Sequence, residues 1–263
     1  MSAIPPSAGY AAAVSELRAA GCVFAEDEAR LLVEAADSPA ELAELVSRRA
    51  GGIPLEHLLG WVEFCGLRIA VAPGVFVPRR RSELLVREAL VLAGQRAVVV
   101  DLCCGSGAIG AALRAEQDRI ELHAADIEPA AVQVARRNLE PGGHVYEGDL
   151  YEPLPDSLRG RVDVLVVNAP YVPTEAIALM PPEARDHEPA VALDGGVDGL
   201  AVLGRIVAGA SVWLAPGGHL LFETSAAQAG AAVDLVTRSG LVARVVSCED
   251  LGATVVVAVL DAQ

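Results

Sequence analysis

Short apolar runs alternate with segments of helical spacing from residue 97 onward, and this alternation limits the fold more than any other feature of the chain. Apolar runs bounded by turn residues are typical of buried strands. Strands that alternate with helices predict a doubly wound α/β sheet whose strands are mostly parallel. The expected strands are 97–102, 120–125, 144–147, 162–167 and 219–223, and the expected helices are 108–116, 129–138, 200–213 and 226–238. Two last strands, 242–247 and 254–260, predict an antiparallel hairpin on the same sheet.

The first part of the chain has a different pattern. Apolar residues recur at helical spacing over residues 9–50, and Ser38 followed by Pro39 marks the start of one helix. Alternating apolar residues around Gly66 then predict a β-hairpin. We therefore predict a small helical N-terminal domain over 1–52, a linker with a β-hairpin over 53–78, and the sheet domain over 79–263.

Charge and residue usage exclude several classes of function. The formal charge of −15 disfavours undirected binding to nucleic acid or to an anionic membrane, because a surface that binds phosphates needs an excess of cations. All 20 basic residues are arginine, which excludes lysine Schiff-base chemistry and the P-loop lysine. Five scattered cysteines without C-x-x-C spacing indicate neither a disulfide framework nor a zinc site, and we expect no metal. This usage fits a reducing cytoplasm, and neither a signal peptide nor a membrane span is expected.

Two expected strand ends carry residues that point to chemistry. The strand 97–102 contains Asp101 and leads into the tight loop Cys103-Cys104-Gly105-Ser106-Gly107. The strand 162–167 leads into Asn168-Ala169-Pro170-Tyr171, which offers an amide oxygen, a bare carbonyl and a flat ring to a planar NH2 group. Asparagine shortly before proline is also common turn chemistry at the end of a buried strand. Because ligands bind at the carboxyl ends of strands in open sheets, we expect the two stretches to lie side by side.

The glycine loop must then be matched to a ligand. Gly105, Gly107 and Gly110 fit the dinucleotide pattern G-x-G-x-x-G, so an NAD enzyme is one candidate. Asp101 argues against it, because an ionised carboxylate before the loop would repel a pyrophosphate. The same charge suits S-adenosyl-L-methionine, which carries a sulfonium and an ammonium group but no phosphate.

On this interpretation Asp126 accepts from the ribose hydroxyls and Asp149 from the adenine amino group. The expected cofactor-binding residues are Asp101, Cys103, Cys104, Gly105, Ser106, Gly107, Asp126, Ile127, Asp149, Leu150 and Asn168.

These residues resemble the class I (Rossmann-like) methyltransferases, and more closely the HemK-type protein-(glutamine-N5) methyltransferases, whose best known substrates are peptide chain release factors. The resemblance rests on Pro54 to Gly60, Pro78-Arg79 with Ser82-Glu83, the loop 101–107, Asp126, Asn168 to Tyr171, and Ala192 to Leu200. It implies methyl transfer from S-adenosyl-L-methionine to the side-chain N5 of a protein glutamine. The catalytic residues it implies are Asn168, Ala169, Pro170 and Tyr171, and the substrate-binding residues are Arg79, Glu83, Asn168 and Tyr171.

The resemblance also implies the setting in which the enzyme acts. We expect a cytoplasmic monomer whose partner is a protein, such as a release factor, with no nucleic acid as direct substrate and no membrane. The N-terminal helical domain is expected to recognise that substrate.

Three motifs depart from the family pattern. The usual Asn-Pro-Pro-Tyr has Ala169 at its second position, which loses the φ restriction of proline. Cys103 and Cys104 begin the loop that is usually Gly-Thr-Gly-Thr-Gly, and the usual Glu-hydrophobic-Gly is 223–225, Glu-Thr-Ser. Two rivals therefore stay open, an N6-adenine or N2-guanine nucleic-acid methyltransferase and a non-catalytic module that binds S-adenosyl-L-methionine.

The three arginines Arg79 to Arg81 have two interpretations. They form either a solvated linker or a patch that meets an anionic or polar partner at the mouth of the site. Ser82, directly after them, is placed to cap the next helix with its side chain.

Overall fold

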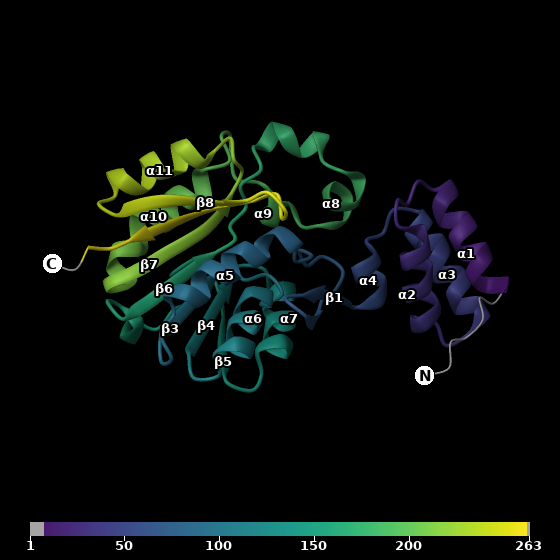
Figure 1. The fold of residues 1–263 in the computed structure, drawn as a ribbon, viewed down its shortest axis with the longest axis horizontal. Helices are drawn as coiled ribbons and strands as arrows, with labels where there is room; N and C mark the ends of the chain where they lie inside the picture. The colour runs from purple at the N-terminus through teal and green to yellow at the C-terminus, as the bar shows by residue number, and fades with distance from the viewer. Residues whose placement is uncertain (1–7, 262–263) are drawn as a thin grey trace.

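A seven-stranded sheet forms the centre of the computed structural model, which describes residues 8–261 (Figure 1). Its order is β5-β4-β3-β6-β7-β9-β8. The strands are β3 (Val98–Leu102), β4 (Glu121–Asp126), β5 (Gly143–Glu147), β6 (Val162–Val167), β7 (Leu214–Thr224), β8 (Val242–Cys248) and β9 (Ala253–Val259). The strands from β3 to β7 are parallel, whereas β9 pairs antiparallel with both β7 and β8. The predicted parallel sheet with an antiparallel hairpin at its end is confirmed.

Helices cover both faces of the sheet. One face carries α5 (Glu83–Leu92), α6 (Ala108–Glu116) and α7 (Pro129–Leu139), and the other carries α10 (Ala201–Trp213) and α11 (Ala229–Arg238). Successive residues of a strand point to opposite faces, so Val99 packs in the first core and Val100 in the second. Every residue of β3 is buried, which explains its continuous apolar run.

The strand order reverses next to β3. From β3 the chain moves outward to β4 and β5, then returns to β6 on the other side of β3. β3 and β6 pair directly, with Leu102 opposite Val167. The glycine loop after β3 and Asn168 after β6 therefore emerge side by side at the point where an open α/β sheet binds its ligands, as predicted.

The N-terminal helices have a core of their own and lie at the end of the molecule away from the sheet (Figure 1). They are α1 (Ala8–Ala19), α2 (Ala25–Ala35) and α3 (Pro39–Ala50). The predicted helix start is confirmed, because the Ser38 hydroxyl accepts the Glu41 N–H at 3.2 Å and Pro39 is the first helical residue. The short helix α4 (Leu55–Leu59) and the hairpin β1 (Trp61–Phe64) and β2 (Leu67–Ala70) lead to the sheet. Residues 1–7 of the predicted domain lie outside the described residues.

Residues 172–194, between β6 and α10, fold into short elements that the sequence pattern does not predict. They are a 3₁₀ turn, η3 (Thr174–Leu179), and the helices α8 (Pro182–His187) and α9 (Ala190–Leu193). Val172 forms an isolated bridge with Asp194, so the segment leaves the sheet and returns to the same place. We call it the 172–194 segment.

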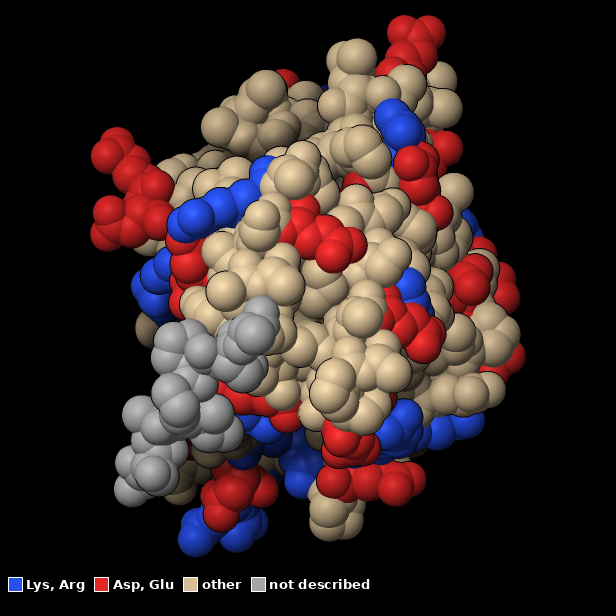
Figure 2. All heavy atoms as spheres, turned by 90° about the vertical axis from the view of Figure 1, so that its right-hand side faces the viewer, with Lys and Arg blue, Asp and Glu red and all other residues tan. Residues whose placement is uncertain are grey.

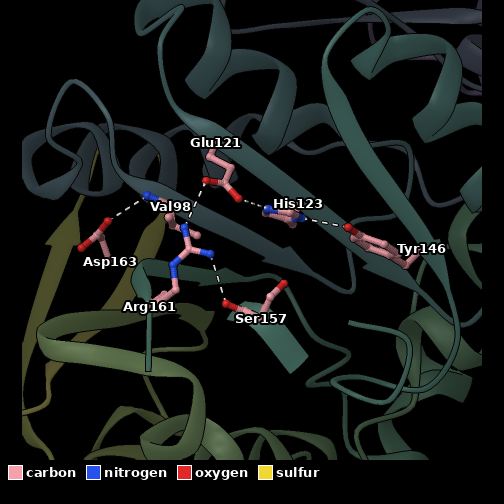
Figure 3. A network of polar contacts seen from close by, with 7 residues as sticks. All are labelled: Val98, Glu121, His123, Tyr146, Ser157, Arg161 and Asp163. Atoms are coloured by element: carbon pink, nitrogen blue, oxygen red, sulfur yellow. Dashed lines mark hydrogen bonds and ion pairs between the residues drawn. The ribbon is translucent and has the colours of Figure 1, made fainter. Parts of the chain in front are cut away.

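A polar network ties the outer strands to the loop before β6 (Figure 3). The residues drawn are Val98, Glu121, His123, Tyr146, Ser157, Arg161 and Asp163. The His123 ring nitrogens lie 3.0 Å from Glu121 and 3.0 Å from the Tyr146 hydroxyl, and Arg161 reaches Glu121 at 3.5 Å. None of the seven residues lines the cavity described below, so the network supports the sheet and not the site. Among residues 8–261, no helix is both long and apolar enough to cross a membrane.

Candidate active site

A cavity of about 500 Å³ opens at the carboxyl ends of β3 and β6. Its walls come from the glycine loop, the Asn168 to Tyr171 stretch, the linker after the hairpin and the 172–194 segment. It gathers most of the predicted site residues, namely Arg79, Cys103, Cys104, Gly105, Ser106, Asp126, Ile127, Asp149, Leu150, Asn168, Ala169, Pro170 and Tyr171. Asp101, Gly107 and Glu83 do not line it. Within the described residues, no cluster of His, Cys, Asp or Glu side chains could hold a metal ion.

Asp101 lies beneath the glycine loop and is completely buried. Its Oδ2 accepts the N–H of Gly110 at 3.0 Å, whereas its Oδ1 meets no donor from the described residues. Burial raises the pKa of this carboxyl to about 7, against the effect of the Gly110 hydrogen bond. Asp101 is therefore part of the support beneath the loop and does not line the cavity.

The glycine loop is held from two sides. Asp126 accepts the N–H of Gly105 at 2.8 Å, and Asn138 on α7 donates to the Ser106 carbonyl at 2.8 Å and to the Ala70 carbonyl at 2.9 Å. The loop needs left-handed backbone, with φ of 54° at Gly105 and 76° at Gly107. The local sequence pattern does not identify Asn138, because its partners lie 32 and 68 residues away.

The loop fits S-adenosyl-L-methionine in its donor set. The Ser106 hydroxyl is buried and, like Asp101 Oδ1, has no hydrogen-bond partner among residues 8–261. Because Ser106 lines the cavity, its free hydroxyl is suited to the ammonium or carboxylate group of an amino acid, with the charge of Asp101 beneath it. Asp149, two residues after the end of β5, is paired with Arg205 of α10 at 2.6 Å, and both residues line the cavity.

The Asn168 to Tyr171 stretch is anchored to a buried carboxylate on β7. Glu223 accepts from Arg81 at 2.8 Å, from the Ser82 hydroxyl at 2.6 Å and from the Tyr171 hydroxyl at 2.9 Å. The Ser82 hydroxyl in turn accepts from Asn168 Nδ2 at 3.2 Å. The prediction that Ser82 caps α5 with its side chain is wrong, because that hydroxyl is used by Glu223 and Asn168 instead.

This arrangement leaves two acceptors free at the cavity. Within the described part of the chain, neither Asn168 Oδ1 nor the Ala169 carbonyl receives a hydrogen bond. Tyr171 lines the same wall, and burial raises the pKa of its hydroxyl, so that the hydroxyl stays a donor to Glu223 at neutral pH.

Glycines of the turn after the 172–194 segment support the same backbone. A Cβ on Gly195 would lie 2.8 Å from the Pro170 carbonyl, and one on Gly199 would collide with the Tyr171 carbonyl. Gln228 donates to that Tyr171 carbonyl at 2.9 Å. Close approach of two backbones explains why this turn is rich in glycine.

The three arginines fit neither predicted role as a group. Arg79 pairs with the buried Glu188 at 2.6 Å, and Arg81 pairs with Glu223, so two of the three neutralise buried carboxylates. Burial raises the pKa of Glu188, and Arg79 opposes that shift. Arg79 and Arg81 thus join the entrance of the cavity to the 172–194 segment and to β7.

The fold and this site define a class I methyltransferase that uses S-adenosyl-L-methionine. The family model described as "Methyltransferase small domain" matches residues 66–180. The chain belongs to the release factor glutamine methyltransferase family.

Curated relatives support the family, and a solved structure supports the fold. The release factor glutamine methyltransferase of Geobacter sulfurreducens is 41% identical over 77% of this chain and 72% of its own length. That of Mycolicibacterium smegmatis is 39% identical over 86% of this chain and 82% of its own length. The crystal structure of a methyltransferase from Pyrococcus furiosus shares the fold, with a TM-score of 0.55 at 15% identity over 74% of this chain and 90% of its own.

Proposed function

We propose that this chain methylates the side-chain N5 of a glutamine in a peptide chain release factor or a similar protein, and that it does so in the cytoplasm. The observation that carries the proposal is the pair of free acceptors, Asn168 Oδ1 and the Ala169 carbonyl, beside Tyr171 in the cavity. An NH2 group has two hydrogens, and two acceptors match it. The names of the relatives support the choice of release factor as substrate.

The proposed mechanism follows from the chemistry of an amide. The nitrogen of a glutamine amide is a poor nucleophile, because its lone pair is delocalised into the carbonyl. Asn168 and Ala169 each accept one N–H, which turns the lone pair toward the reacting methyl group and stabilises the positive charge that develops on nitrogen. Tyr171 packs against the amide plane. No general base is needed before transfer, because the nitrogen loses its proton to solvent only after the new N–C bond has formed and the methyl–sulfur bond has broken.

S-Adenosyl-L-methionine supplies an electrophilic methyl group on a sulfonium. We assign its amino acid part to the Ser106 hydroxyl, with the Asp101 carboxylate beneath. Asp126 and Asp149 remain the proposed partners of ribose and adenine, although Asp126 already accepts from the N–H groups of Gly105 and Glu128, and Asp149 from Arg205. A carboxylate accepts several hydrogen bonds, so both roles are compatible.

The N-terminal helices are proposed to recognise the protein substrate. Figure 2 shows this end of the molecule, where the charged groups of the described residues are of mixed sign and form no continuous basic area. Such a surface suits a protein partner better than a phosphate backbone. The proposal that the chain acts as a monomer is separate and is tested by its mass in solution.

The decisive experiment is transfer of a labelled methyl group to purified release factors. We expect label on one glutamine, and no label on a release factor whose target glutamine is replaced by asparagine. Equal amounts of DNA and RNA are offered in parallel. Label on a base and none on protein would contradict the proposal in favour of the nucleic-acid rival, whereas tight binding of S-adenosylhomocysteine without labelling would favour the non-catalytic module.

A further inference from the structure

We propose that Ser82 and Glu223 are positioning residues that fix which end of the Asn168 side-chain amide faces the substrate. This inference rests on the proposed role of Asn168 in the reaction. Glu223 is buried and does not line the cavity, whereas Ser82 is part of the cavity wall but its hydroxyl is bonded to Glu223 and Asn168, so we assign neither residue a direct contact with the reacting atoms.

The argument begins with the single hydrogen of a hydroxyl group. Ser82 Oγ lies 2.6 Å from Glu223 Oε2, the length of a strong hydrogen bond to a carboxylate, so its hydrogen points at Glu223. Toward any other neighbour this hydroxyl is then only an acceptor. Its other neighbour is the Asn168 side chain at 3.2 Å.

An acceptor at this position selects one orientation of the asparagine amide. The NH2 group of Asn168 faces Ser82, and Oδ1 faces the cavity. Rotation of the amide by half a turn would place Oδ1 against an oxygen that has no hydrogen to offer, and would present two donors to the substrate. A glutamine NH2 group needs an acceptor there, so the rotated form cannot hold it.

Glu223 supports the same arrangement at a second residue. The carboxylate that fixes the Ser82 hydrogen also accepts the Tyr171 hydroxyl at 2.9 Å, and Arg81 neutralises it at 2.8 Å. One buried carboxylate thus sets the direction of Asn168 through Ser82 and the position of Tyr171 directly. Because hydrogen-bonded groups that form a network depend on one another, loss of one member should affect the others.

The amide orientation can be measured without any substrate. The chain contains only two asparagines, Asn138 and Asn168, so protein labelled with ¹⁵N-asparagine has two side-chain NH2 signals. Asn168→Ala identifies the Asn168 signal by its loss. Asn138 serves as an internal reference, because its NH2 group is fully bonded to Ser106 and Ala70.

We expect Ser82→Ala to shift the Asn168 signal and to speed its hydrogen exchange at least about tenfold, the scale of one lost hydrogen bond, while the Asn138 signal stays in place. Ser82→Thr keeps the hydroxyl and should keep the wild-type signal. An Asn168 signal that Ser82→Ala leaves unchanged would overturn the inference.

Methyl transfer supplies the second readout. We expect Ser82→Ala to lower kcat about tenfold with little change in the KM for S-adenosyl-L-methionine, and Ser82→Thr to restore kcat. In the Asn168→Ala background the same substitution should change kcat less than about twofold, because Ser82 acts through Asn168. Equal fold losses in the two backgrounds would contradict a positioning role. A wild-type protein that labels no glutamine would refute the proposed function, whereas the NMR result would still decide how Asn168 is oriented.

Discussion

Arg49 on α3 donates a hydrogen bond of 2.5 Å to Glu183 on α8, which joins the N-terminal helices to a wall of the cavity. The same guanidinium holds the buried Glu28 of α2 at 2.6 Å. One buried cation of the proposed substrate-recognition domain therefore pairs both with that domain and with the 172–194 segment. This side chain thus links the two parts in addition to the chain connection through α4.

Loss of that cation should destabilise the protein. We expect Arg49→Met to lower the free energy of unfolding by about 3–5 kcal/mol, because Glu28 would be left buried without a partner. The control is Glu183→Gln, whose side chain is 46% exposed and whose loss leaves the Arg49–Glu28 pair intact; it should cost less than about 1 kcal/mol. Urea unfolding measures both, and equal costs would mean that burial of the pair does not control stability.

Asn168→Ala should remove most of the activity but not the fold. We expect kcat to fall by about 10²–10³-fold, the range for losing one pre-organised polar contact in a transition state. Calorimetric titration with S-adenosylhomocysteine should still show saturable binding, which shows that the cavity is intact. Full turnover by the variant would rule out the role proposed for Asn168.

The turn beneath Tyr171 should not tolerate a side chain. Gly199 has φ of +75°, and a Cβ there would collide with the Tyr171 carbonyl, so Gly199→Ala should cost more than about 1 kcal/mol and reduce kcat. Gly204→Ala on α10 is the matched control. A Cβ at Gly204 meets nothing within 4 Å, and alanine in a helix should stabilise the protein by about 0.5–1 kcal/mol. A lower melting temperature for Gly199→Ala and a higher one for Gly204→Ala would confirm the close approach of Gly199 to the Tyr171 carbonyl.

Asp101 should make stability depend on pH. Its pKa of about 7 in the folded protein is above the ordinary value of 3.8, so the folded state binds more protons between these values. The free energy of unfolding should therefore fall as pH rises from about 4 to 7, by up to about 4 kcal/mol from this group alone.

The comparison with Asp101→Asn isolates this effect. Asparagine can still accept from Gly110 but cannot ionise, so the stability of the variant relative to wild type should increase with pH across that range. Parallel pH profiles of the two proteins would show that Asp101 does not titrate there.

Local sequence patterns predicted the sheet and its helices well, because each element carries its own period and its own boundary residues. Strand β6 and helix α6 have the predicted bounds. Asn168 could be placed beside the glycine loop because ligands of open α/β sheets bind at the carboxyl ends of the strands, and this rule depends only on the order of the parallel strands.

The parts of the site that the sequence did not predict depend on contacts between residues far apart in the chain. Glu223 meets Ser82 across 141 residues, and Glu188 meets Arg79 across 109, and no local spacing encodes such pairs. The prediction for Ser82 was wrong because a serine before a helix usually caps it, and a buried carboxylate competed for the hydroxyl. The 172–194 segment was not predicted because its helices are held by Arg49 and Arg79 and are too short to show a periodic pattern.

Cys103, at the start of the glycine loop, should make the enzyme resistant to oxidation. Cys103 lines the cavity, but burial raises the pKa of its thiol, and the nearby Asp126 adds to that shift. Peroxide attacks thiolates, and this sulfur stays protonated at neutral pH. We therefore expect the enzyme to keep its methyltransferase activity at peroxide concentrations that inactivate enzymes with exposed catalytic thiolates. Thiol-reactive inhibitors directed at Cys103 should likewise react slowly.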